Sequence, residues 1–175
     1  MVNVGFINVG FFVGIILSLG LFIGGLFMPK AATYTYIILY TLLAGYAFIA
    51  NRINPDVDPK KWTPEEIEII KKYYWPLKFP HGAKSFSLLL NSLRFASILF
   101  VILFLLKQMW IPALILALYF VIIFFFTTSF IIKLDPFFCL SNKAKKGDLY
   151  AENELFLLKN IYEKMYTTNI SEKYW

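Results

Sequence analysis

The chain has 175 residues, of which 59% are hydrophobic and only 16% are charged. A soluble domain of this length needs more charge to cover its surface, so the composition excludes a soluble globular protein. The single cysteine and single histidine, Cys139 and His81, exclude an intramolecular disulfide, a cysteine cluster and a two-histidine haem. We therefore expect no catalytic residues, no cofactor and no metal site.

Four apolar stretches, 5–28, 34–50, 86–106 and 110–132, dominate the chain. Each can cross about 30 Å of hydrocarbon as a helix. They predict an all-α integral membrane protein with four transmembrane helices arranged as two hairpins, and a short cytoplasmic amphipathic helix after each hairpin. The expected divisions are a first hairpin (1–50), a cytoplasmic loop (51–85), a second hairpin (86–132) and a cytoplasmic C-terminal segment (133–175).

The first stretch lacks a basic start and a good cleavage site, so we interpret it as a retained span and not as a signal peptide. Gly10, Gly14 and Ser18 recur in it at intervals of four residues, which leaves one helical face nearly bare of side chains. Such a face lets a neighbouring helix approach closely. We expect it to pack against the second or the fourth stretch, and homodimerisation is the alternative.

Lysine and arginine are distributed very unevenly between the loops. Seven lie between the second and third stretches and seven follow the fourth, whereas the other two loops hold only Lys30 and Lys107. Cytoplasmic loops carry the excess of basic residues in membrane proteins. Both termini and the middle loop are therefore expected in the cytoplasm, and the bacterial inner membrane is our default location because the chain shows no eukaryotic targeting signal.

The net charge of +6 then lies beside the membrane, where it indicates contact with anionic lipids and not with nucleic acid. The lysines expected to make this contact are Lys60, Lys61, Lys71, Lys72, Lys143, Lys145 and Lys146.

Two polar segments predict amphipathic helices. Thr63, Pro64 and Glu66 have the spacing of a capping box with proline at the first helical position, and Pro76 is expected to end that helix. Near the C-terminus, apolar residues from Leu155 to Met165 recur at helical spacing. Each helix needs an apolar surface to cover, and we expect the first to lie near the membrane surface.

Arg94 is the most informative residue, because it lies near the middle of the third stretch. A cation at that depth costs about 2.5 to 3.5 kcal/mol even on a lenient insertion scale, so it should face protein, water or a partner. No aspartate or glutamate occurs in any of the four stretches. Ser87, Asn91, Arg94 and Ser97 form one polar stripe on this helix, and counting along the second stretch places Tyr40 level with Arg94. We expect a tyrosine hydroxyl and free carbonyls to bind the guanidinium.

Three interpretations of Arg94 stay open. It is a structural arginine satisfied within the bundle or reaching toward the headgroups, the partner of a carboxylate on another membrane subunit, or the lining of a wet path for an anion. The leading hypothesis is a non-enzymatic accessory or assembly subunit of a larger membrane complex, in contact with other membrane subunits and lipids. The alternative is an oligomeric channel or transporter for an anion or polar solute, lined by Asn91 and Arg94.

Overall fold

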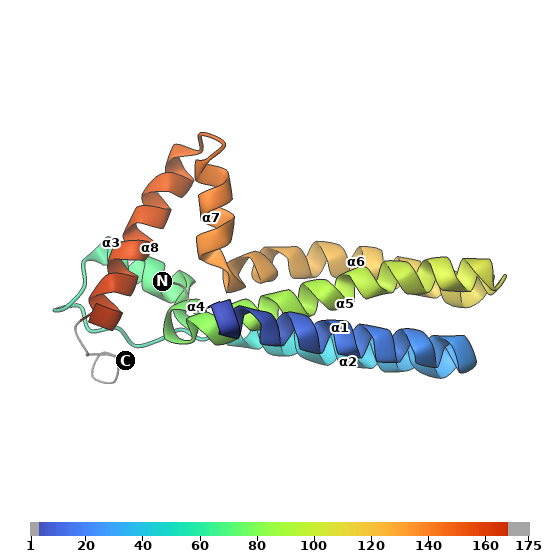
Figure 1. The fold of residues 1–175 in the computed structure, drawn as a ribbon. Coiled ribbons are helices and arrows are strands. Elements are labelled where there is room, and N and C mark those ends of the chain that lie inside the picture. The colour runs from blue at the N-terminus through green and yellow to red at the C-terminus, as the bar shows by residue number, and fades with distance from the viewer. Residues whose placement is uncertain (1–3, 168–175) are drawn as a thin grey trace.

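The computed structural model describes residues 4–167, and this part of the chain folds entirely into helices and their connections (Figure 1). A long bundle occupies one end and a compact group of shorter helices the other. The elements are α1 (Val4–Phe27), α2 (Pro29–Ala50), α3 (Pro64–Lys72), α4 (Tyr74–Lys78), α5 (Pro80–Leu106), α6 (Trp110–Leu134), α7 (Pro136–Ala144) and α8 (Leu149–Thr167).

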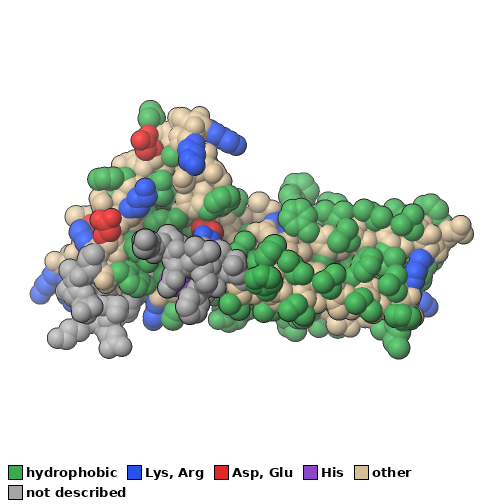
Figure 2. All heavy atoms as spheres, viewed as in Figure 1, with side chains coloured by type: hydrophobic (Ala, Val, Ile, Leu, Met, Phe, Trp, Pro, Cys, Tyr) green, Lys and Arg blue, Asp and Glu red, His purple; other side chains and the backbone are tan. Residues whose placement is uncertain are grey.

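Three of the bundle helices, α2, α5 and α6, are long and apolar enough to cross a membrane. The apolar part of α1 counted in the same way, Phe11–Phe27, is shorter than these three. Apolar side chains cover most of the visible bundle surface (Figure 2). A hydrophobic outer surface of this extent is what a membrane protein presents to lipid, and it sets the class of the protein.

Helix α1 packs most extensively on α5, more so than on its neighbour in sequence, α2. The small residues are the reason. A methyl group built on Gly14 would come within 2.7 Å of the Ser92 Cβ, and one on Gly25 would come within 2.8 Å of the Phe100 ring. The small-residue face therefore meets the third apolar stretch, and our expectation of the second or fourth was wrong.

Gly14→Ala should destabilise the bundle by about 1–3 kcal/mol, because the added methyl group must displace either Ser92 or the helix backbone. The measurement is thermal unfolding of the purified protein in detergent. Gly20→Ala is the matched control, since a methyl group there meets nothing within 4 Å. Ser92→Gly should restore the stability of Gly14→Ala, and equal losses at Gly14 and Gly20 would contradict the α1–α5 contact.

The shorter helices α3, α4, α7 and α8 form what we call the head, at one end of the bundle (Figure 1). The capping box at Thr63 and Glu66 is present as predicted, with Pro64 at the first helical position. The helix ends at Lys72, however, and Pro76 lies inside α4, so proline does not terminate it. The non-helical backbone at Tyr73 makes the break.

Helix α7 was not predicted. It starts immediately after α6, with Pro136 in its first turn and the Asp135 carboxylate accepting a hydrogen bond of 3.3 Å from the Phe138 amide. An aspartate before a proline is a helix start, so the signal was present in the sequence. Gly147, with φ of 87°, then allows the turn into α8.

The head helices cover one another. Ile70 of α3, Leu77 of α4 and Tyr73 between these helices share a core with Leu158 and Ile161 of α8. This core is separate from the one that fills the bundle. The apolar face of α3 is therefore buried against α8. The position of α3 near the membrane surface stays a prediction.

Candidate functional site

Arg94 lies near the middle of α5, and its side chain is only 9% exposed. Its Nη2 donates hydrogen bonds to the Phe124 carbonyl at 2.8 Å and to the Thr128 hydroxyl at 2.6 Å, both on α6. Its Nη1 donates a longer hydrogen bond, 3.4 Å, to the Asn91 side-chain oxygen. The guanidinium thus joins α5 to α6.

The partners of Arg94 are all neutral. The Phe124 ring adds a cation–π contact, with its centroid 4.4 Å from the guanidinium carbon. The four bundle helices contain no aspartate or glutamate, so no carboxylate of these helices balances the charge. The Arg94 Nε is buried and has no hydrogen-bond partner among the described residues. The site binds the guanidinium through neutral hydrogen-bond acceptors and the face of an aromatic ring. Among the described residues it supplies no acceptor for the N–H group of Nε.

The guanidinium is displaced toward the head. Arginine side chains on a helix point toward its N-terminus, which for α5 is the head end. Thr128, which receives the guanidinium, is about 9 Å along α6 from Leu134, the last residue of that helix. The charge is therefore closer to the head end of the bundle than the Arg94 backbone is.

The rest of the predicted polar stripe faces the protein interior. Ser87 and Ser97 are buried and Asn91 is half-buried. The Ser97 hydroxyl donates to the Arg94 carbonyl at 2.6 Å, so it is satisfied by the backbone of its own helix. Only Asn91 among these residues contacts the guanidinium.

Tyr40 is fully buried at nearly the predicted level but does not accept a hydrogen bond from Arg94. Its hydroxyl lies 3.4 Å from that of Thr127, the residue next to Thr128. The expectation that a tyrosine hydroxyl binds the guanidinium was therefore wrong, whereas a backbone carbonyl, that of Phe124, does bind it. Phe124 and Thr128, which bind the guanidinium from α6, were not predicted.

The small residues of α1 have separate roles. Gly14 makes the close approach to α5 described above, and the Ser18 hydroxyl donates to the Gly14 carbonyl at 2.6 Å. Gly10 belongs to α1, but its surroundings lie outside what the structure describes.

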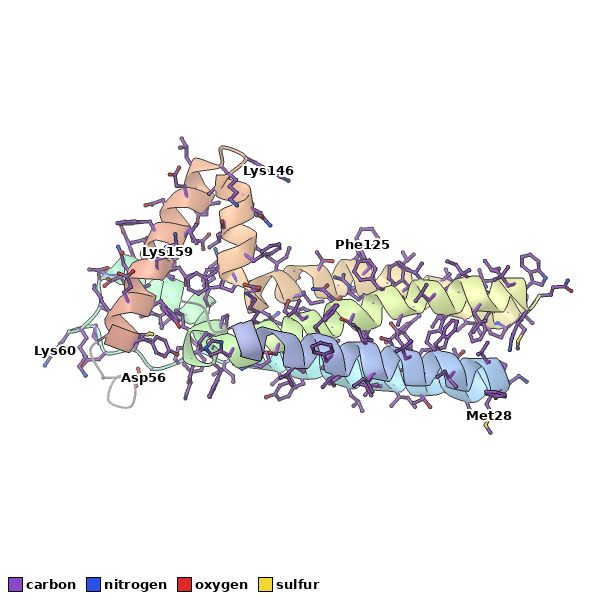
Figure 3. The ribbon with its side chains drawn as sticks, in the orientation of Figure 1. Met28, Asp56, Lys60, Phe125, Lys146 and Lys159 are labelled. Carbon is purple, nitrogen blue, oxygen red and sulfur yellow. The ribbon has the colours of Figure 1, made fainter. Side chains whose placement is uncertain are left out.

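The predicted lipid-contact lysines do not form one surface. Figure 3 shows Lys60 at the end of the head away from the bundle and Lys146 at the apex between α7 and α8. They lie in the loop before α3 (Lys60, Lys61), at the end of α3 (Lys71, Lys72), in α7 (Lys143) and in the α7–α8 turn (Lys145, Lys146). Lys72 is engaged in an ion pair with Glu154 of α8.

Fold and site define a helical membrane protein with a buried intramembrane arginine and a packed helical head. The chain matches no protein-family model, and no curated protein and no solved structure is significantly similar to it. Its function must therefore be argued from its own residues.

Proposed function

We propose that the protein is a non-enzymatic accessory or assembly subunit of a larger membrane complex. In this proposal α1 joins α2, α5 and α6 as a fourth span, the spans form two hairpins, and both termini and the head lie in the cytoplasm. The observation that carries the proposal is the enclosure of Arg94 between α5 and α6.

Enclosure of Arg94 favours a structural role over a conduit. A residue that binds a passing anion must present its donors to water, whereas Nη2 of Arg94 is already engaged twice and Nε is buried. An arginine held in this way joins α5 to α6 inside the bundle. The surfaces left for partners are then the outside of the bundle and the head.

The head offers exposed apolar side chains beyond the bundle. Phe156, in the middle of α8, is 61% exposed, and Leu149 and Tyr150 at the start of α8 are 79% and 73% exposed. Large exposed apolar groups at one site support contact with another protein subunit.

The test is native mass measurement of the protein after mild solubilisation from its host. We expect a second membrane subunit at fixed stoichiometry, lost on Phe156→Ser but retained on the matched α8 variant Lys159→Ser. Arg94→Leu should keep the partner and change no flux in liposomes. A pure monomer or homo-oligomer whose solute flux is abolished by Arg94→Leu would establish the channel alternative in its place.

A further inference from the structure

A cavity of about 230 Å³ lies where the head-side end of α6 meets the head. Its walls come from Ser129, Ile132 and Lys133 of α6, from Lys143 and other residues of α7, and from the adjoining ends of α3 and α8. The volume is below that of sites for whole drug-sized ligands, and it suits a compact polar group. The cavity brings together two lysines from our predicted lipid-contact set, Lys72 and Lys143, with Lys133, which that set omitted.

Three lysines and two carboxylates line this cavity, which gives a formal charge of +1. The ammonium groups of Lys133 and Lys143 have no hydrogen bond or ion pair within the described residues, whereas Lys72 is paired with Glu154. The other carboxylate of the lining, Asp148, accepts a hydrogen bond of 3.1 Å from the Ala151 amide at the start of α8. Lys133 and Lys143 therefore line a cavity whose two carboxylates already accept hydrogen bonds from other groups.

The thiol of the cavity adds no negative charge at neutral pH. Burial raises the pKa of Cys139 above its ordinary value, and the nearby Asp135 raises it further. Ser129 supplies a neutral hydroxyl instead. This combination of ammonium and hydroxyl donors is the chemistry that binds a phosphate group.

The position of the cavity on α6 indicates where the phosphate comes from. Ser129 and Ile132 share one face of α6 with Phe125, because the intervals are four and three residues. Phe125 is 75% exposed, and Ile122 and Leu118 continue the same exposed face with 56% each. Figure 3 shows Phe125 on the side of α6 from which α7 and α8 rise. An apolar track thus runs along the bundle from the basic cavity.

We propose that this cavity binds the phosphate of an anionic phospholipid between Lys133 and Lys143, with the acyl chains lying along the Leu118–Ile122–Phe125 face of α6. The site holds one lipid at a defined place, in contrast to general attraction between scattered lysines and the membrane surface. It would fix the angle between α6 and the head, since both contribute walls.

The test uses delipidated full-length protein titrated with phosphatidylglycerol and followed by native mass spectrometry. The double variant Lys133→Gln/Lys143→Gln should bind the first lipid about 30-fold more weakly, the loss expected for two lysine charges close to an anionic group. Lys60→Gln/Lys61→Gln removes the same charge at a site away from the bundle and should bind as the unaltered protein does. Equal weakening in both double variants would overturn the proposal.

Glycerol phosphate, which has the phosphate without acyl chains, distinguishes the two sources of the ligand. It should fail to displace the lipid at equal concentration, and displacement would overturn the lipid assignment in favour of a soluble phosphate compound. Should the double variant not fold, lysine acylation of the unaltered protein decides the matter. Phosphatidylglycerol should protect Lys133 and Lys143 but not Lys60, and absence of protection at Lys133 and Lys143 overturns the proposal.

Discussion

Arg94→Met should leave the bundle as stable as before or more stable, whereas Thr128→Val should destabilise it by about 1.5–3 kcal/mol. Methionine fills a similar volume without a charge, and replacing a buried charge by an apolar side chain is often neutral or stabilising. Valine removes the hydroxyl that accepts from Nη2 at 2.6 Å and leaves the cation in place. A hydrogen bond to a charged group contributes about 1.5–3 kcal/mol, and its loss leaves one N–H of Arg94 Nη2 without an acceptor.

The double variant Arg94→Met/Thr128→Val provides the control. Once the guanidinium is absent, the Thr128 hydroxyl has no cation to accept from, so the double variant should be close to Arg94→Met in stability. The measurement is thermal unfolding of all four proteins in one detergent. If Arg94→Met is instead the most destabilised of the set, the buried arginine contributes net stability to the bundle. The prediction that its charge costs stability would then be wrong.

The charge at mid-bundle could be predicted from the sequence, but its partners could not. The position of Arg94 and the lack of carboxylates in the apolar stretches follow from the sequence directly. Which helix face meets Arg94 depends on how α5 and α6 rotate against each other. That rotation follows from packing over the whole interface, including the approach of α1 at Gly14. Thr128 carries no sequence signal of its own in so aromatic a stretch.

In the head, too, contacts within one helix could be predicted from the sequence, whereas contacts between distant helices could not. The start of α3 was predictable because Thr63, Pro64 and Glu66 act within one helical turn. The burial of α3 against α8 was not, because an amphipathic face shows that a helix needs cover without showing what covers it. In this chain the apolar face of α3 is covered by α8. The two helices are far apart in sequence, since the hydrogen-bonded residues Lys72 and Glu154 are separated by 82 residues.

Glu66 takes part both in the capping box at the start of α3 and in the contact between α3 and α8. Its carboxylate accepts a hydrogen bond of 2.9 Å from the Thr63 amide and a second one from the Lys164 ammonium of α8. Burial by itself would raise the pKa of Glu66, but hydrogen bonds from Lys164 and Thr63 outweigh it and leave the pKa below its ordinary value of 4.5. The ionised form is therefore favoured in the folded head.

Glu66→Ala should destabilise the head by about 1–3 kcal/mol. The loss combines a helix cap with the ion pair to Lys164, and the exposed Lys164 side chain limits the contribution of that pair. Hydrogen exchange of the α3 and α8 backbone amides in the full chain measures this effect. Glu68→Ala removes an exposed glutamate of the same helix and should change little.

The same carboxylate should make the head sensitive to acid. Because the pKa is lower in the folded state, the stabilisation by Glu66 is complete above about pH 4.5, the pKa of the unfolded chain, and is lost as the pH falls through the lower folded value. The protection of the α3 and α8 amides, taken relative to their intrinsic exchange rate at each pH, should fall in that range for the unaltered protein and for Glu68→Ala. Glu66→Ala should show a flatter dependence, because its cap is already absent; an equally steep acid response in Glu66→Ala would place the sensitive group elsewhere in the head.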